Sequence, residues 1–215
     1  MNVLFLQFLL GVIFLTIISL HIIKKNIGTV IAYGIQSFVV VLILLNSFFE
    51  TNNTVLLFVI LLTFIVKVIL APVFFIRLIK RHELTFSAST NLNMPLTLII
   101  LAGLTAIAHS DQLSPLGNII PTHHALLLLA LSSIFISLFL IVNRKGAFSQ
   151  AIGILSLENS IVSFAIFAGL EQSLILQVGI ISDILIWIMI ASVFIAMIYR
   201  HFGSLDTSLM KHLKD

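Results

Sequence analysis

Cysteine is absent from the 215-residue chain, and its absence limits the chemistry that the chain can carry. Without thiols, the chain has no disulfides, no thiolate metal ligands and no cysteine-held iron–sulfur clusters. Haem bound between helices would need facing histidines inside apolar segments, and His21 is the only histidine within such a segment. We therefore expect no metal and no cofactor, and we expect that this chain carries no electrons itself.

Charge is also scarce. Only 9% of the residues are charged, 60% are hydrophobic, and the mean hydropathy is +1.23. A soluble domain needs far more charge on its surface, whereas a membrane crossing takes about 20 apolar residues, so the length allows roughly seven crossings. The fold class expected is all-α, a polytopic bundle of transmembrane helices, because runs this long do not alternate as barrel strands do. The basic residues lie at the ends of the apolar runs, so the formal charge of +3 does not indicate nucleic-acid binding.

The apolar runs predict a single membrane domain. We expect membrane spans at residues 3–23, 28–49, 55–77, 94–108, 125–142, 151–170 and 174–199. They divide into a first three-helix unit with its cytoplasmic loop (1–93), a connector helix with an external loop (94–124), and a second three-helix unit with a tail (125–215). No lysine or arginine precedes Lys24, which favours an inserted first helix over a cleaved signal peptide.

Loop charge predicts the orientation of these spans. The second, fourth and sixth loops contain no lysine or arginine and hold Glu50, Asp111 and Glu171 instead. The positive-inside rule therefore places the N-terminus outside and the C-terminus in the cytoplasm. The basic residues of the other loops and of the tail are Lys24, Lys25, Arg77, Lys80, Arg81, Arg144, Lys145, Arg200, Lys211 and Lys214.

Three ionisable side chains lie inside the expected spans: Lys67, Glu158 and Asp183. Each costs about 2.5–3.5 kcal/mol or more at a helix centre on insertion scales, so each must face protein or water. Ionisable groups at this depth commonly mark ion or proton pathways. The alternative for each is a structural role, as an ion pair or as a hydrogen bond between helices.

Lys67 is close to the middle of its span, and Pro72 follows it. On α-helical spacing, Pro72 frees the carbonyl of Val68, so an amine and a carbonyl together are suited to hold water. Burial favours the neutral form of a lysine and allows it to exchange protons. The structural alternative is an ion pair with Glu158 or Asp183.

Glu158 lies on a helix that carries a stripe of small and polar residues. We expect Glu158 to point almost opposite to that stripe, so that both faces need protein contact and the helix lies between its own bundle and a neighbouring subunit. A buried carboxyl favours its protonated form and can carry a proton. The residues of the stripe, which suit close helix packing, are Gly153, Ser156, Asn159, Ser160 and Ser163.

Two segments of the chain each resemble part of a known protein family. The segment from Arg144 to Asn159, in which a basic loop leads into a helix with a mid-membrane glutamate, resembles the K subunit of respiratory complex I. This likeness extends over about residues 125–215, because it also includes Asp183, Arg200 and the tail S-L-D-T-S-L at 204–209. The run F-I-V-K-V-I-L-A-P at 64–72 resembles the third span of the hydrogenase-4 component E family. Members of that family have about this length, and their C-terminal half is similar to the K subunit.

The resemblance implies a function and a set of partners. It implies a membrane-arm subunit of a formate hydrogenlyase or group 4 hydrogenase-like complex, in the cell membrane of a bacterium or archaeon. The implied partners are antiporter-like membrane subunits, a membrane anchor subunit and peripheral redox subunits, with lipid around them. Lys67, Glu158 and Asp183 carry over as the proton path. The alternatives are component C of a multisubunit cation/proton antiporter, which also resembles the K subunit but has about half this length, and a stand-alone transporter or channel.

Overall fold

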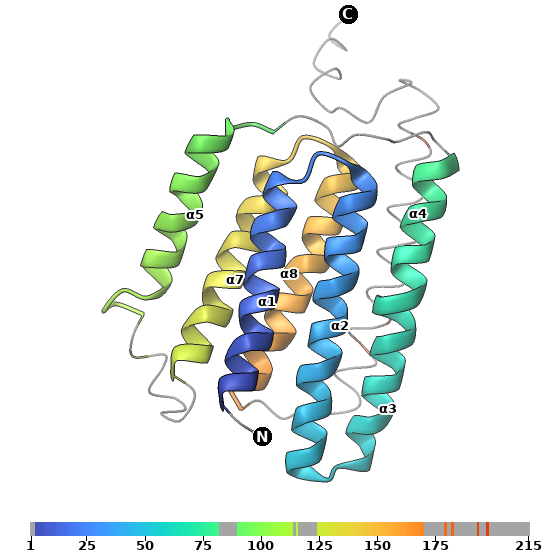
Figure 1. Cartoon of the computed structure of the whole chain (residues 1–215), viewed down its shortest axis with the longest axis vertical. Helices are drawn as coiled ribbons and strands as arrows, with labels where there is room; N and C mark the ends of the chain where they lie inside the picture. The colour runs from blue at the N-terminus through green and yellow to red at the C-terminus, as the bar shows by residue number, and fades with distance from the viewer. Residues whose placement is uncertain are drawn as a thin grey trace, which may run out of the picture.

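The computed structural model describes residues 3–81, 90–113, 115 and 124–169, with isolated positions at 179, 182, 193 and 197. All the regular elements in these ranges are helices, as the sequence predicts (Figure 1). The span expected at 174–199 lies outside the described ranges. The helices are α1 (Val3–Ile22), α2 (Asn26–Thr51), α3 (Thr54–Thr63), the π-helix η1 (Phe64–Leu70), α4 (Ala71–Arg81), α5 (Met94–Ala108), α7 (His124–Asn143) and α8 (Ala147–Phe167).

Within the described residues, five helices are long and apolar enough to cross a membrane. They are α1, α2, α7, α8 and the continuous helix Thr54–Arg81, which has 28 residues and contains α3, η1 and α4. Helix α5 is a shorter apolar helix, and its bounds are those of the span expected at 94–108. Helix α8 begins at Ala147 rather than at the expected residue 151.

Capping residues account for several helix ends. Helix α2 ends at Thr51 and is capped by Asn52, whose φ of 51° lies in the left-handed region that asparagine tolerates. Asn53 then starts α3 by accepting a hydrogen bond from the N–H of Val55. Asn93 caps α5 in the same way through the N–H of Leu96, and Pro95 occupies the first turn, where its missing N–H costs nothing.

Helices α1, α2, α8 and α7 form the centre of the bundle. In this order each packs against the next, and α7 closes the ring by packing against α1. The continuous helix Thr54–Arg81 lies against α2 on one side, and α5 lies against α7 on the other (Figure 1). This arrangement leaves α8 and η1 within reach of each other's side chains, with α2 between them.

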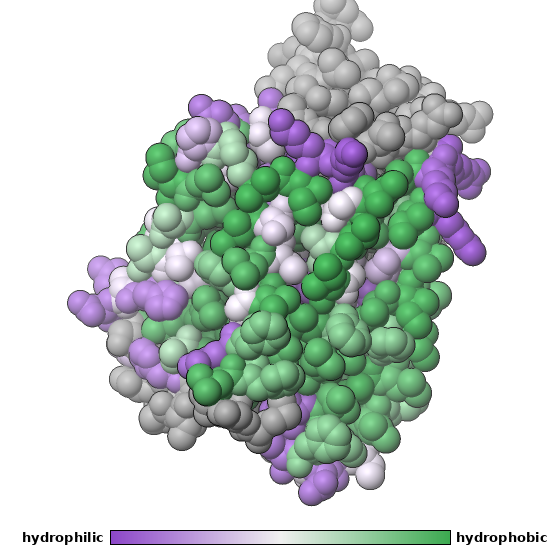
Figure 2. Space-filling model, viewed as in Figure 1, coloured by the Kyte–Doolittle hydropathy of each residue, from purple (hydrophilic) through white to green (hydrophobic). Residues whose placement is uncertain are grey.

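The surface of the bundle is apolar at mid-height. Leu15, Ile35 and Ile65, near the middle of their helices, are 62%, 46% and 40% exposed, and Figure 2 shows hydrophobic residues over the middle of this face and hydrophilic residues towards its ends. The interior holds polar side chains, including Gln36 and Asn159, that are completely buried. An apolar exterior around a partly polar interior suits lipid as the solvent, and the chain is thus built as a multi-pass membrane protein.

The described basic loop residues gather at one end of the bundle. The α1–α2 connection, the end of α4 and the α7–α8 connection lie at the same end, shown uppermost in Figure 1. The α2–α3 connection lies at the opposite end. Helix α5 stops short of that end, because Nδ1 of His109 lies 3.5 Å from the hydroxyl of Ser132, which is near the middle of α7. We call the two ends of the bundle the basic end, which carries Lys24, Lys25, Arg81, Arg144 and Lys145, and the acidic end, which carries Glu50.

Candidate functional site

Lys67 lies on η1, near the midpoint of the helix Thr54–Arg81. At a rise of about 1.5 Å per residue, its Cα lies roughly 20 Å from either end of that helix. The π-helical segment ends with a bond from the N–H of Ala71 to the carbonyl of Val66, five residues back. Single π-helical turns within α-helices are frequent at functional sites. The local backbone therefore marks the same residue that its depth singles out.

The π-helix adds a second carbonyl to the one expected beside Pro72. On α-helical spacing Pro72 frees the carbonyl of Val68, and this stays a prediction. On π-helical spacing the N–H of Ala71 bonds to the carbonyl of Val66, so the donor for the Lys67 carbonyl would come from Pro72, which has no N–H.

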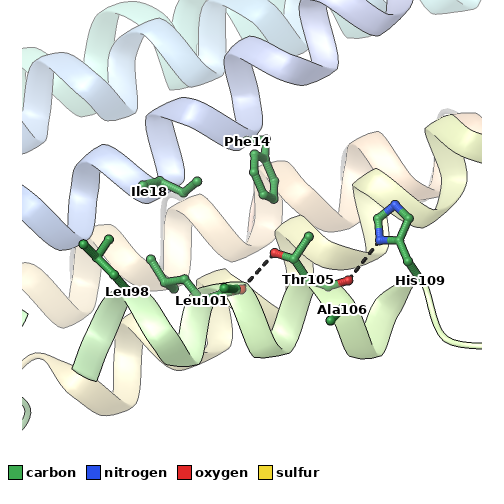
Figure 3. A pocket seen from close by; sticks show the side chains of 8 residues that line it. Phe14, Ile18, Leu98, Leu101, Thr105, Ala106 and His109 are labelled. Atoms are coloured by element: carbon green, nitrogen blue, oxygen red, sulfur yellow. Dashed lines mark hydrogen bonds between the residues drawn. The ribbon is translucent and has the colours of Figure 1, made fainter. Parts of the chain in front are cut away.

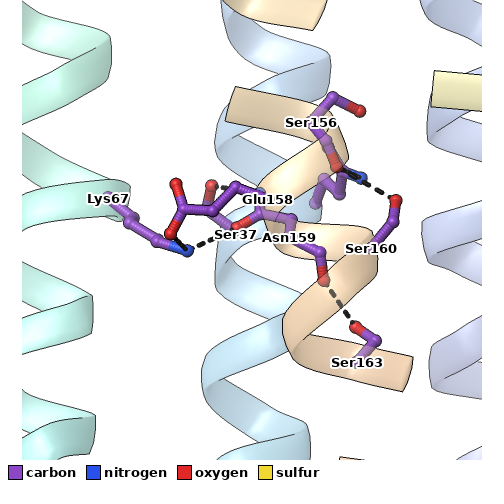
Figure 4. A network of polar contacts seen from close by, with 8 residues as sticks. Ser37, Lys67, Ser156, Glu158, Asn159, Ser160 and Ser163 are labelled. Carbon is purple, nitrogen blue, oxygen red and sulfur yellow. Dashed lines mark hydrogen bonds and ion pairs between the residues drawn. The ribbon is translucent and has the colours of Figure 1, made fainter. Parts of the chain in front are cut away.

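The Lys67 ammonium bonds two adjacent residues of α8 (Figure 4). Its Nζ lies 2.8 Å from Oε1 of Glu158 and donates a 3.0 Å hydrogen bond to Oδ1 of Asn159. The Lys67 side chain is only 1% exposed, whereas that of Glu158 is 22% exposed. The structure thus forms the expected ion pair between Lys67 and Glu158, but Glu158 is only partly buried.

The geometry of α8 explains why one amine reaches both residues. Consecutive residues on an α-helix are about 100° apart around the axis, so the long Glu158 side chain and Asn159 diverge from neighbouring positions. Figure 4 shows Glu158 directed to Lys67, on the other side of α8 from Ser156 and Ser160, as expected. Asn159 is the residue of the stripe that also reaches Lys67.

Asn159 continues the network to α2. Its Nδ2 donates a 2.9 Å hydrogen bond to Oγ of Ser37, and both side chains are completely buried. Tyr33 lies one turn before Ser37 on the same helix and is also completely buried, but its hydroxyl has no hydrogen-bond partner among the described residues. The polar chain therefore runs from Glu158 through Lys67 and Asn159 to Ser37, across three helical segments.

The remaining residues of the stripe join α8 to α7. The hydroxyls of Ser137 and Ser160 are 3.1 Å apart, and Ser160 also donates to the carbonyl of Ser156 at 3.0 Å. Gly153 allows close approach, because a Cβ there would lie 3.0 Å from the Ile141 side chain. This part of the stripe acts as the expected surface for close helix packing.

Three buried polar atoms beside the network have no hydrogen-bond partner among the described residues. They are the Tyr33 hydroxyl, Oε1 of Gln36 and Oγ of Ser156. Gln36 and Ser156 are adjacent, because Nε2 of Gln36 donates a 3.3 Å hydrogen bond to the carbonyl of Ser156, and both side chains are completely buried. Buried polar atoms of this kind are the usual ligands of internal water. The neighbourhood of Lys67 and Glu158 therefore has the chemistry needed to hold water.

The structure brings Lys67 and Glu158 together, while Asp183 lies outside the described residues. Sequence reasoning missed Ser37 as a member of the network. A signal was present, because Gln36 and Ser37 form a polar pair in an otherwise apolar stretch of α2. The parts of the chain that the structure describes contain no group of three or more His, Asp or Glu residues placed to bind a metal ion.

Arg144, expected as a basic loop residue, is 3% exposed. Its guanidinium donates hydrogen bonds to the carbonyls of Leu20 and Ile23, the latter at 2.9 Å, at the C-terminal end of α1. Burial lowers the pKa of Arg144 below its ordinary value. The guanidinium satisfies carbonyls that have no partner within the helix, and its charge is favourable at this end of the helix dipole. Arg144 therefore fastens the α7–α8 turn to α1.

Comparison with known proteins adds one relative. Over 130 residues the chain is 32% identical to the uncharacterized protein Rv0085 of Mycobacterium tuberculosis. The matched region covers 60% of this chain and 58% of the relative, so the likeness extends over less than two thirds of that protein. No protein-family model matches the chain, and no solved structure matches it.

Proposed function

We propose that this chain is a non-redox membrane-arm subunit of a hydrogenase-like or complex I-related complex. In this proposal Lys67, Glu158 and Asp183 contribute to proton translocation or its coupling. The observation that carries the proposal is the contact of 2.8 Å between Lys67 and Glu158, near the midpoints of their helices. An acid and a base in contact at this depth form a coupled pair, in which the protonation of one group sets the proton affinity of the other.

The pair can move a proton without changing its own net charge. A proton taken up by the Glu158 carboxylate removes the counter-charge of Lys67 and so favours the release of a proton from the ammonium. The pair is neutral before and after this step. Transfer of the proton from Glu158 to Lys67 across the contact then restores the starting state. Partial exposure of Glu158 and complete burial of Lys67 give the two groups different surroundings, which such a cycle requires.

The proposal includes seven spans, with the N-terminus outside and the C-terminus in the cytoplasm. Its support is the gathering of Lys24, Lys25, Arg81, Arg144 and Lys145 at the basic end, opposite to Glu50. By the positive-inside rule the basic end faces the cytoplasm. We place the protein in the cell membrane of a bacterium or archaeon, and its relative Rv0085 is bacterial.

The proposed partners follow from the sequence motifs. The run at 64–72 and the segment 144–159 resemble the hydrogenase-4 component E family and the K subunit, whose complexes contain antiporter-like subunits, a membrane anchor and peripheral redox subunits. The second candidate is component C of a multisubunit cation/proton antiporter, or a stand-alone transporter. The Lys67–Glu158 pair also suits this second candidate, because the pair needs no redox centre to exchange protons.

Purification of the tagged chain from its native membranes in a mild detergent tests the proposal. We expect antiporter-like, anchor and redox subunits to co-purify in one complex, identified by mass spectrometry, and to be absent from a parallel preparation of the untagged chain. Recovery with antiporter subunits and without redox subunits would establish the second candidate. A stable monomer without partners would establish a stand-alone protein.

A further inference from the structure

One face of α2 changes from polar to apolar at the level of the Lys67 network. Buried polar residues follow one another on this face, at helical spacing, from the basic end to Ser37. Beyond Ser37 the face continues with Val40 and Leu44, which belong to the apolar core. The polar part rises roughly 16 Å, which is close to half of a hydrocarbon core about 30 Å thick. Its residues, which we call the polar face of α2, are Asn26, Thr29, Tyr33, Gln36 and Ser37.

Helix α8 lies against α2 in a fixed register. Both helices begin at the basic end and run in the same direction (Figure 1). Nε2 of Gln36 donates to the carbonyl of Ser156, which is 120 positions away, and this bond sets the register. At the same offset Thr29 is level with Ser149, which is also buried. Polar residues of both helices therefore occur at matching depths between the basic end and the middle of the membrane.

The inner end of the polar face has polar atoms that are free to bind water. The Tyr33 hydroxyl, Oε1 of Gln36 and Oγ of Ser156 are buried without a hydrogen-bond partner among the described residues. Two hydroxyls that can donate and an amide oxygen that accepts offer the two to four partners that an internal water molecule needs. On α2, the next such atom towards the acidic end is Oδ1 of Asn46.

Apolar side chains separate the Lys67 network from the acidic end. Four of them, from α2, α3 and α8, are at most 4% exposed and belong to one core cluster. Thr63 and Ser163 lie one turn from the network on this side, and the Ser163 hydroxyl donates to a carbonyl of its own helix. Beyond them, the described parts of α2, α3 and α8 contain no buried polar side chain before Asn46. The four apolar residues are Val40, Leu44, Val59 and Val162.

The groove on the outside of the bundle does not lead to this site. Figure 3 shows the groove, which has a volume of about 590 Å³ and an apolar lining except for Thr105 and His109. The Thr105 hydroxyl donates to the carbonyl of Leu101 at 2.8 Å, and Nδ1 of His109 lies 2.9 Å from the carbonyl of Thr105. The groove lies between α1 and α5, whereas α2 separates α1 from the helix that carries Lys67. Water at Lys67 therefore needs another route.

We propose that water reaches the Lys67–Glu158 contact from the basic end of the bundle, along the polar face of α2, and not from the acidic end. Tyr33, Gln36 and Ser156 bind this water at the inner end of the path. In the proposed orientation the basic end is cytoplasmic, so the pair exchanges protons with the cytoplasm through the bound water. The exchange of protons rests on the proposed function, whereas the binding of water does not.

Hydroxyl-radical labelling tests the path, because radicals formed from bound water by an X-ray pulse modify the side chains beside that water. The full chain is irradiated in native membrane vesicles, and the labelling rate of each residue is divided by its rate in the denatured chain. We expect Tyr33 to be labelled faster on this scale than Phe75, a 1% exposed aromatic residue of the same core cluster. Leu44 should be as protected as Phe75. Equal protection of Tyr33 and Phe75, or faster labelling of Leu44, would overturn the proposal.

Variants identify the residues that bind the water. Gln36→Leu with Ser156→Ala removes two of the three ligands, so we expect the labelling rate of Tyr33 to fall to that of Phe75. Ser163→Ala removes a buried hydroxyl on the acidic side and should leave Tyr33 labelling unchanged. Unchanged labelling of Tyr33 in the double variant would refute the assignment of these ligands. The labelling requires no pumping, so its failure would leave the proposed function open, and normal pumping by Lys67→Met would leave the water site intact.

Discussion

Lys67 and Glu158 lie 2.8 Å apart, one on the π-helical segment of the long helix and the other near the middle of α8. The contact joins two helices that have few backbone contacts with each other, because α2 lies between them. Each group alone would carry an unfavourable insertion energy at this depth, and the contact offsets part of that energy for both. The two residues should therefore respond to substitution as one unit.

Replacing Lys67 should destabilise the fold, and replacing Glu158 as well should restore part of the lost stability. We expect Lys67→Met to lower the free energy of unfolding by about 3 kcal/mol, at the low end for a broken buried pair because Glu158 is partly exposed. Adding Glu158→Gln should recover about 1–2 kcal/mol through the coupling between contacting residues. The measurement is a double-mutant cycle of unfolding in mixed micelles.

The control for this cycle is Lys80→Met, which removes a positive charge from the exposed end of the same helix. It should change the stability by less than about 0.5 kcal/mol. If the effects of Lys67→Met and Glu158→Gln were simply additive, the two side chains would not be coupled in the membrane.

Asn159 should matter more than its serine neighbours, because it bonds two other helical segments. Asn159→Leu leaves Lys67 with one partner fewer and removes the donor to Ser37, so we expect a loss of about 1–3 kcal/mol. Ser163 is also completely buried, but its hydroxyl donates only to the Asn159 carbonyl of its own helix. Ser163→Ala should cost less than about 1 kcal/mol. Thermal unfolding in detergent would compare them, and equal losses would argue against a bridging role for Asn159.

Arg144 should stabilise the basic end of the bundle through α1. Arg144→Leu removes the guanidinium bonds to the carbonyls of Leu20 and Ile23, and we expect a cost of about 1–3 kcal/mol. Lys25→Leu removes one positive charge from the same end at an exposed position and should be close to neutral. Proteolysis of the α1–α2 connection should accelerate in Arg144→Leu alone. Similar behaviour of the two variants would mean that Arg144 acts only as a loop charge.

The helices could be predicted from the sequence because each depends on a local property. An apolar run bounded by Asn93 and His109 contains its own start and stop, and α5 has the predicted bounds. The depth of Lys67 and Glu158 also follows from counting residues along an apolar run. The sequence does not contain the rotation of one helix relative to another, so it left Glu158 and Asp183 as equal candidates for the partner of Lys67.

Two further features depend on packing and could not be predicted. The π-helix at Lys67 adds one residue to a turn, and Pro72 alone does not distinguish a π-helical turn from an ordinary kink. Arg144 looks in the sequence like any other basic loop residue. Its burial depends on how the α7–α8 turn meets the end of α1, which is a contact between residues more than a hundred positions apart.

Reporter fusions should establish the orientation. Fusions after Arg81, Arg144 and Arg200 should show cytoplasmic activity, and a fusion near Asp111 should show external activity, because lysine and arginine are confined to alternate loops. Alkaline phosphatase and a fluorescent protein, fused at identical positions, provide opposite readouts at each site. A cytoplasmic signal near Asp111 would contradict the arrangement of seven spans.

The proton path should be measurable in the whole complex. Glu158→Gln keeps the shape of the side chain and removes its titratable proton, so we expect the complex to assemble and to move fewer protons per redox turnover. Asp183→Asn and Lys67→Met should lower the same ratio, although Lys67→Met leaves the Glu158 carboxylate without its counter-charge and should also reduce assembly. The measurement is proton uptake by proteoliposomes, normalised to redox turnover.

Ser163→Ala, which keeps the network of Lys67 intact, is the matched control and should pump at the normal ratio. Normal pumping by all three assembled variants would show that these residues are structural, because a proton cannot pass through a glutamine or a methionine at the contact.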